Sequence, residues 1–175
     1  HISKYCFTQT GKELVKELKP LLSETEILLE GKYVSEAKEL INERGYPPIS
    51  ALNEIQRDIH LSRIDGSILS AKAVFNIFEL AICSTNLKSY LSQNRDISPL
   101  LSEFSTFLFE DKLFERYISS IFDPSGEVKD TASKSLQSIR REIRDRSDEL
   151  RRYVTKIVKD LTEKEVTRDN YLTLR

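Results

Sequence analysis

The chain has 175 residues, a formal net charge of −1 at pH 7, and only 5 glycines and 5 prolines. This length is enough for one domain with a hydrophobic core, or for one domain plus an extension. The near-neutral charge excludes a global electrostatic attraction to nucleic acid or to an anionic membrane, so any such contact must be local. The scarcity of Gly and Pro favours an all-α fold over a turn-rich sheet protein.

The sequence also bounds the cellular context of the chain. It contains no run approaching the roughly 18 consecutive apolar residues of a membrane helix and no visible export signal, so we expect a cytoplasmic protein without membrane contact. Cys6 and Cys83 have no Cys or His neighbour at metal-ligand spacing, and we expect two buried, reduced thiols. No Met occurs, even at position 1, so we expect a fragment of a longer protein.

The amino-terminal part is predicted to form the first helices of a helical base. Two short helices are expected within residues 2–22, with Thr10 as a cap. Ser23 begins a Ser-x-x-Glu capping box, which predicts a helix that ends at Gly45. The following Tyr-Pro-Pro at residues 46–48 must be extended, because a residue that precedes proline is disfavoured in the helical region.

The central part is predicted to supply the core of the base. Residues 52–61 carry apolar side chains at helical spacing. Ser67 is expected to cap a helix over residues 68–93, and since that helix is apolar on almost every side we expect it to be buried all round.

An aromatic-rich helical hairpin is predicted over residues 99–122. Ser98 is expected to cap its first helix, and the hairpin is interrupted near Glu110. The sequence Asp-Pro-Ser-Gly at residues 123–126 fits a type I turn. This turn leads into the last helix.

Residues 130–165 are predicted to form one helix about 50 Å long, because each residue adds about 1.5 Å. This helix is expected to be an arm on the base, with a charged face and an apolar stripe that needs a partner along its whole length. The stripe repeats at every seventh position: Leu136, Ile143, Leu150 and Ile157. Residues 166–175 alternate like a strand whose partners lie outside the chain. We therefore divide the chain into a base (1–129), an arm (130–165) and the start of a strand (166–175).

The basic side chains of the arm are the one feature with a candidate ligand, since Lys and Arg on a long helix can follow a phosphate backbone. The candidate nucleic-acid contacts are Arg140, Arg144, Arg151 and Lys156. The alternative, which we favour, is a solvated face whose charges pair with one another. Three acid-before-base pairs have the i,i+4 spacing that stabilises an exposed helix: Glu142 with Arg146, Asp148 with Arg152, and Asp160 with Lys164.

No catalytic, cofactor or metal site is predicted in these 175 residues. The glycines are isolated, and none begins a phosphate-binding loop. Asp58, His60 and Asp65 form the one cluster of acid and imidazole groups, but their spacing matches no ligand pattern. We interpret His60 as a surface residue beside a turn, and an enzyme with a site at His60 is the least favoured function.

Residues 121–143 contain three motifs in succession: an acidic turn of the form D-x-x-G-E-V, then D-[ST]-A-S, then a helix with L-x-x-I-R-R-x-I. In all three parts the chain resembles the type-II MutS family, which are bacterial paralogues of the mismatch-repair MutS proteins. Weaker matches occur at residues 45–55, which include Gly-Tyr-Pro-Pro, and at residues 166–175.

The resemblance implies that the chain is the amino-terminal core, or lever, region of a larger protein. In the family, levers connect an ATPase domain to a clamp that closes on nucleic acid, and the assembly is a dimer. Members are DNA-binding ATPases that restrain recombination, many with a nuclease domain, and some act on collided ribosomes.

ATP, Mg and nuclease activity are therefore expected of the parent protein, whose partners are DNA, branched DNA included, or ribosomal RNA. The fragment itself is expected to be no enzyme. The alternative is a stand-alone helical module that binds a partner helix through the apolar stripe.

Overall fold

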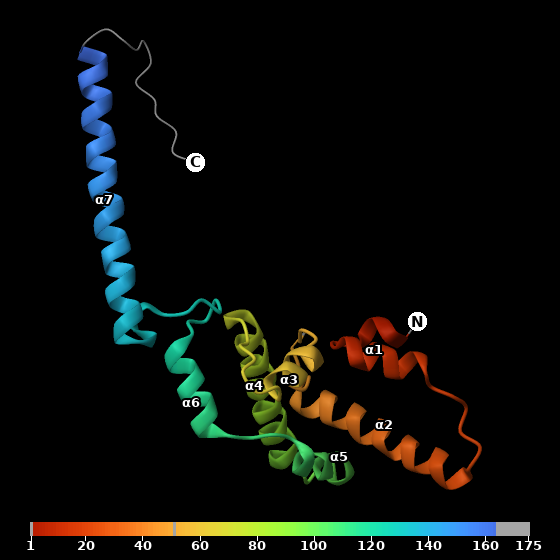
Figure 1. Ribbon diagram of the computed structural model, residues 1–175. Helices are drawn as coiled ribbons and strands as arrows, with labels where there is room; N and C mark the ends of the chain where they lie inside the picture. The colour runs from red at the N-terminus through yellow and green to blue at the C-terminus, as the bar shows by residue number, and fades with distance from the viewer. Residues whose placement is uncertain (1, 51, 164–175) are drawn as a thin grey trace. The chain divides into compact units, whose positions relative to one another are not determined.

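The structure, a computed structural model, describes residues 2–50 and 52–163. These residues are all-α, as predicted: they form seven α-helices and three short 3-10 helices, and no strand occurs among them (Figure 1). The chain divides into two compact units, His1–Glu127 and Val128–Arg175. The predicted strand at residues 166–175 lies outside the described residues. Within residues 2–50 and 52–163, no helix combines the length and apolarity that crossing a lipid bilayer requires.

The chain begins with a 3-10 helix, η1 (Ile2–Tyr5), and a short α-helix, α1 (Gln9–Lys16). Thr8 caps α1, not Thr10 as predicted: its hydroxyl oxygen accepts a hydrogen bond from the Gly11 N–H at 3.0 Å. Thr8 has the extended backbone conformation that an N-cap residue needs to reach a free N–H, whereas Thr10 is already helical.

The second helix, α2 (Glu24–Arg44), runs without a break through Gly31 and ends at Gly45, as predicted. Gly45 has φ of +83°, which glycine adopts without strain. Ser23 is the N-cap residue, but its side chain makes no capping hydrogen bond. The predicted capping box therefore places the helix start correctly without forming its hydrogen bond.

The centre of the base is α4 (Ala71–Gln93), which follows the short helix α3 (Gln56–Ser62). It begins three residues later than predicted, because Ser70 is the cap and accepts from the Ala73 N–H at 3.1 Å. Ser67 instead donates its hydroxyl hydrogen to the Leu61 carbonyl oxygen. The other helices of the base cover α4 only in part, so the prediction that α4 is buried all round is wrong. Its buried residues are Ala73, Ala81, Cys83 and Leu91.

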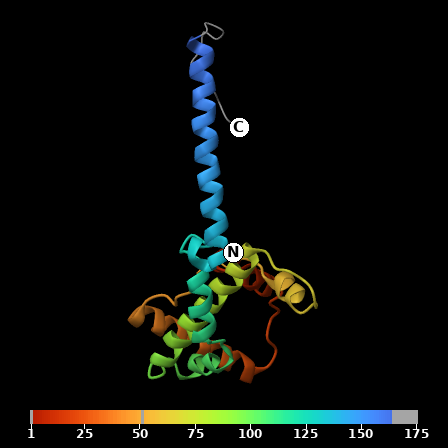
Figure 2. The same cartoon turned by 60° about the vertical axis from the view of Figure 1, so that its left-hand side comes forward.

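The predicted hairpin is built from α5 (Pro99–Glu103), η2 (Phe104–Phe107) and α6 (Lys112–Ile121). All three contact α4, and α5 also contacts α2 (Figures 1 and 2). Asp111 interrupts the hairpin as predicted, since its carboxylate accepts from the Leu113 and Phe114 N–H groups, both at 2.9 Å, and so caps α6.

The N-terminus of α5, the first helix of the hairpin, is capped by a side chain of another helix. The carboxylate of Glu36, on α2, accepts from the Leu100 N–H at 3.2 Å and from the Leu101 N–H at 3.0 Å. Ser98, the predicted cap, is fully buried and donates its hydroxyl hydrogen to the Asn94 carbonyl oxygen at 3.1 Å. A side chain of one helix thus satisfies the free N–H groups of another.

The predicted turn at residues 123–126 closes the first unit. The Gly126 N–H donates to the Asp123 carbonyl oxygen at 3.1 Å, as in a hydrogen-bonded β-turn. Gly126 has φ of +85°, and a Cβ at this position would lie 2.9 Å from the ring of Phe75. That ring packs against Phe122 with 5.5 Å between ring centroids. Both the backbone conformation and the close approach therefore require glycine here.

The second unit contains η3 (Asp130–Ala132) and the long helix α7 (Lys134–Glu163). The 30 residues of α7 give it a length of about 45 Å. The helix begins four residues later than predicted, because residues 130–132 form a 3-10 turn and Ser133 is extended. The Ser133 hydroxyl oxygen accepts from the Leu136 N–H at 3.1 Å, as an N-cap does.

Candidate functional site

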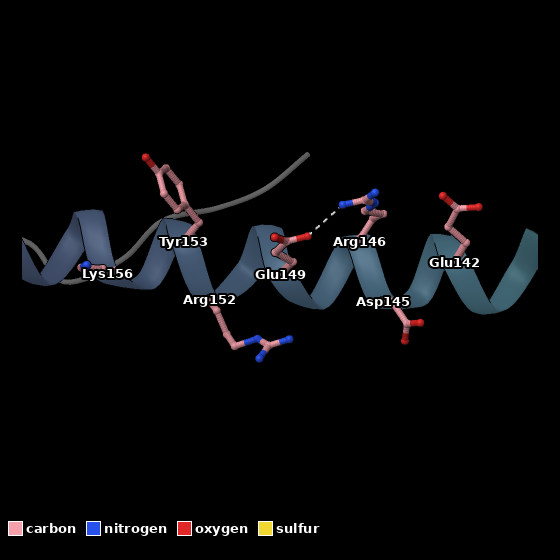
Figure 3. Close-up of a pocket in the computed structure, with 7 residues that line it drawn as sticks. All are labelled: Glu142, Asp145, Arg146, Glu149, Arg152, Tyr153 and Lys156. Atoms are coloured by element: carbon pink, nitrogen blue, oxygen red, sulfur yellow. Dashed lines mark hydrogen bonds and ion pairs between the residues drawn. The ribbon is translucent and has the colours of Figure 1, made fainter.

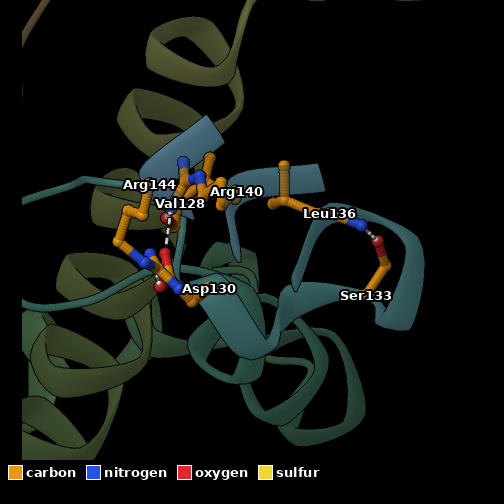
Figure 4. Close-up of polar contacts among 6 residues, drawn as sticks. All are labelled: Val128, Asp130, Ser133, Leu136, Arg140 and Arg144. Carbon is orange, nitrogen blue, oxygen red and sulfur yellow. Dashed lines mark hydrogen bonds and ion pairs between the residues drawn. The ribbon is translucent and has the colours of Figure 1, made fainter. Parts of the chain in front are cut away.

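The start of α7 holds a cluster of three charged side chains, Asp130, Arg140 and Arg144, which we call the Asp130 cluster (Figure 4). Nη1 of Arg140 lies 2.6 Å from Oδ1 of Asp130, and Nη1 of Arg144 lies 2.9 Å from Oδ2. Arg140 Nη1 also donates to the carbonyl oxygen of Val128 at 2.8 Å. Each carboxylate oxygen therefore has its own guanidinium, and Arg140 also holds the backbone two residues before Asp130.

These hydrogen bonds change the acidity of Asp130. The Arg140 side chain, and then the Arg144 side chain, hold the pKa of Asp130 below its ordinary value, because both donate to its ionised form. Asp130 is therefore a carboxylate at neutral pH. Two of the four candidate nucleic-acid contacts, Arg140 and Arg144, are thus brought together on an anionic partner within the chain.

Sequence reasoning missed Asp130 as a partner of these arginines. The predicted helix began at residue 130, and an Asp inside the helix could not turn back toward the side chains of the next turns. The missed signal is Ser133, the last residue of the Asp-Thr-Ala-Ser sequence. As an N-cap it leaves Asp130 outside the helix and free to face the first turns of α7.

The middle of α7 carries a face of mixed charge that borders an open hollow (Figure 3). Its lining contains three carboxylates, three cationic side chains and one tyrosine: Glu142, Asp145, Glu149, Arg146, Arg152, Lys156 and Tyr153. A track that follows a phosphate backbone is expected to be basic. The balanced charge of this hollow favours a solvated, self-paired face.

The pairing on this face differs in detail from the predicted i,i+4 scheme. Arg146 pairs with Glu149 at 3.3 Å, one position short of i,i+4, and not with Glu142 (Figure 3). The Arg152 Nε–H donates to the Asp148 backbone carbonyl at 3.3 Å. Ion pairs this exposed contribute about 0–1 kcal/mol, so the sequence specifies the partners only weakly. The predicted pair of Asp160 with Lys164 extends beyond the described residues.

The remaining two candidate contacts lie further along α7. Arg151 is exposed and does not line the hollow. Lys156 lines the hollow together with the three carboxylates. Of the four predicted contacts, Arg151 is therefore the one that the structure places neither in the Asp130 cluster nor beside the acidic groups of the hollow.

The predicted apolar stripe is present on α7; Leu136 at its start is half-buried, and the three later positions are exposed. Ile143 is 59% exposed, Leu150 56% and Ile157 43%. A row of exposed aliphatic side chains this long is typical of a surface that packs against a partner. The structure thus gives α7 an apolar face beside a face of balanced charge.

The remaining candidate groups, His60 and the two cysteines, lie apart from α7 in the sequence. His60 lies in the last turn of α3 and is exposed. Among residues 2–50 and 52–163, no group of three or more His, Cys, Asp or Glu side chains could hold a metal ion. Both thiols are free; Cys83 is buried as predicted, but Cys6 is only half-buried.

The base also contains an apolar pocket between α3, α4 and the start of α6, lined by residues such as Ile55, Leu80 and Phe114. Its polar atoms are already engaged: Ser84 donates to the Phe109 carbonyl oxygen at 2.9 Å, and the Cys83 thiol lies 3.6 Å from the Pro48 carbonyl oxygen. The pocket therefore has few polar groups left to orient a ligand.

Sequence comparison finds relatives along almost the whole length of the chain. No family model matches the chain. It is 26% identical over 172 residues to endonuclease MutS2 of Alkaliphilus oremlandii and 27% identical over 182 residues to that of Halothermothrix orenii. It is 30% identical over 174 residues to a MutS2 protein of Bacillus subtilis. These matches cover 97–99% of this chain but only 22–23% of the relatives' length.

Proposed function

Since this chain is of the MutS2 type, we propose that it is the helical lever of a larger DNA-binding ATPase. In this proposal the chain couples the nucleotide state of an ATPase domain to a clamp on nucleic acid. The ATPase, its ATP and Mg, the clamp and any nuclease are assigned to segments outside these 175 residues. In this proposal the chain itself transmits a movement between these segments and carries out no catalytic step.

One observation carries the proposal, which is the length and continuity of α7. A helix of 30 residues without Gly or Pro spans about 45 Å and bends little. Its start is fixed by the Ser133 cap and by the Asp130 cluster. A rigid rotation of such a helix carries a small displacement at one end to the other, as in other switching proteins.

The exposed stripe supports a second part of the proposal, that the lever works as a packed pair of helices. Leu150 and its neighbours on the stripe would pack against another helix of the parent protein. The nucleic acid would be DNA or ribosomal RNA, bound by the parent as a dimer. A cytoplasmic location goes with this function and stays a prediction.

The test is a break in α7 of the full-length protein. Proline in a helix interior costs about 3 kcal/mol, because it removes a hydrogen bond and clashes with the preceding turn. We expect Leu150→Pro to abolish the stimulation of ATPase activity by nucleic acid and to leave the basal ATPase rate unchanged. Leu150→Ala is the control for the lost side chain: it keeps the helix and removes only one contact of the packed pair, so most of the stimulation should survive. Nucleic-acid stimulation that survives Leu150→Pro would overturn the lever proposal.

The exposed stripe also favours a second candidate function, a helical module that binds a partner helix in the manner of other amphipathic helices. In that case Leu150→Ala would weaken partner capture as strongly as Leu150→Pro, because the side chain and not the rigidity of α7 would matter. The pair of variants therefore separates the two functions.

A further inference from the structure

We propose that Asp130 is a positioning residue that locks residues 128–133 onto the first turns of α7. In this arrangement the long helix and the segment leading into it move as one rigid body. The inference deepens the lever function and rests on it for its biological meaning. Its structural content rests on the described geometry alone.

The geometry of Arg140 carries the first step. One nitrogen of its guanidinium, Nη1, contacts both the Val128 carbonyl oxygen at 2.8 Å and the Asp130 carboxylate at 2.6 Å. Arg140 therefore holds a backbone group and a side chain on the same short segment. Hydrogen bonds with ionised partners are stronger than neutral ones, and their geometry is more specific.

The second step comes from Arg144. Residues four apart lie on one face of a helix, so Arg140 and Arg144 present their guanidinium groups to the same carboxylate (Figure 4). Arg144 takes the second oxygen of Asp130, at 2.9 Å. The carboxylate thus bridges side chains from two successive turns of α7 and cannot move away without breaking both contacts.

Partial shielding distinguishes this cluster from the ion pairs further along the helix. The Arg140 side chain is 35% exposed and Asp130 44%, whereas Arg146 and Glu149 are 74% and 69% exposed. A network of charges with shared partners also contributes more than an isolated surface pair. Arg140 is therefore committed to positioning, and we do not expect it to contact phosphate.

The test is hydrogen exchange in the full-length protein, measured by mass spectrometry on peptides that cover residues 128–136. In this segment the Ala132 N–H donates to Lys129 O at 3.0 Å and the Leu136 N–H to Ser133 Oγ. We expect Asp130→Asn to make these amides exchange about fivefold faster, since loss of the cluster favours local opening. Asp145→Asn, at an exposed carboxylate on α7 outside the Asp130 cluster, is the matched control and should leave the exchange of this segment unchanged.

A double variant separates positioning by the cluster from a general effect of charge. If Asp130 acts through Arg140, then Asp130→Asn combined with Arg140→Gln should exchange no faster than the more severe single variant. Equal exchange in Asp130→Asn and in the unmodified protein would overturn the inference, as would additive effects of the two substitutions.

This measurement needs neither ATP nor nucleic acid, so its failure is distinguishable from failure of the lever function. Unchanged exchange in Asp130→Asn, together with loss of ATPase stimulation in Leu150→Pro, would contradict the positioning role of Asp130 and support the lever proposal. Faster exchange in Asp130→Asn, together with full stimulation in Leu150→Pro, would support the positioning role of Asp130 and contradict the lever proposal.

Discussion

At the scale of single residues, one carboxylate connects two helices of the base. Glu36 of α2 accepts hydrogen bonds from the Leu100 and Leu101 N–H groups at the start of α5. These N–H groups have no partner within their own helix, and a negative charge is also favoured near a helix N-terminus. The contact is therefore both a cap and a tertiary link.

We expect Glu36→Ala to lower the free energy of unfolding by about 1–2 kcal/mol, the usual cost of removing a helix cap. Urea denaturation, followed by circular dichroism, measures this change. Glu39→Ala on the same helix is the control, because Glu39 is exposed and is not among the capping residues. Equal losses in the two variants would show that the capping contact contributes nothing beyond a generic loss of a glutamate.

Caps are also where sequence reasoning was least accurate. Thr8 and Ser70 cap their helices where Thr10 and Ser67 were predicted, because several Ser and Thr residues stand near each helix start. Only the backbone conformation decides between them. The cap by Glu36 was beyond prediction, since it joins residues 64 apart in the sequence.

At the scale of elements, the turn at residues 123–126 shows how a short motif is stabilised. Besides the backbone hydrogen bond of the turn, Oδ1 of Asp123 accepts from the Ser125 hydroxyl at 2.6 Å, from the Ser125 N–H at 2.8 Å and from the Glu127 N–H at 3.0 Å. The sequence predicted the turn from Asp, Pro and Gly at their preferred positions. The structure adds that the carboxylate gathers most of the hydrogen bonds.

This arrangement predicts a pH dependence of stability. The Ser125 hydroxyl, and then backbone N–H groups, lower the pKa of Asp123 below its ordinary value of 3.8 in the folded state. A lowered pKa means that the ionised form stabilises the fold above the ordinary pKa, and that this contribution is lost as the pH falls through the folded pKa. We expect Asp123→Asn to be less stable than the unmodified chain at neutral pH and to converge with it in acid.

Urea midpoints of the two proteins, measured from pH 7 down to about pH 3, test this prediction. Asp130 and the other acidic groups are present in both proteins, so their contributions cancel in the difference. A difference in midpoint that stays constant over this range would contradict it.

The helices themselves were predicted more securely than their burial. The seven-residue recurrence in α7 required a helix, and an uninterrupted helix is found up to Glu163. The apolar composition of α4 predicted complete burial, which is wrong, because composition does not reveal how much of a helix its neighbours cover. The fold class was thus predictable, while the Asp130 cluster depended on where α7 begins.

At the scale of the whole molecule, the balance of charge limits what the chain contributes to nucleic-acid binding. The net charge is −1, and the hollow on α7 contains as many carboxylates as cations. Arg140 and Arg144 face Asp130. These cations of α7 are therefore balanced by acidic groups, and in the proposed function nucleic-acid recognition is expected to depend mainly on other segments.

Arg151 is the candidate that remains, because it lies outside both the Asp130 cluster and the hollow. Each phosphate contact adds about 0.9 to the slope of log affinity against log salt concentration for duplex DNA. We expect Arg151→Ala in the full-length protein to reduce the steepness of this slope by about 0.9, the value for one phosphate contact. Arg152→Ala is the matched control: Arg152 lines the hollow and bonds the Asp148 carbonyl, so the slope should not change.

An equal reduction in both variants would mean that the whole charged face follows the phosphate backbone. No reduction in either would remove Arg151 as a phosphate contact, and in the proposed lever function this part of α7 would then act without touching nucleic acid.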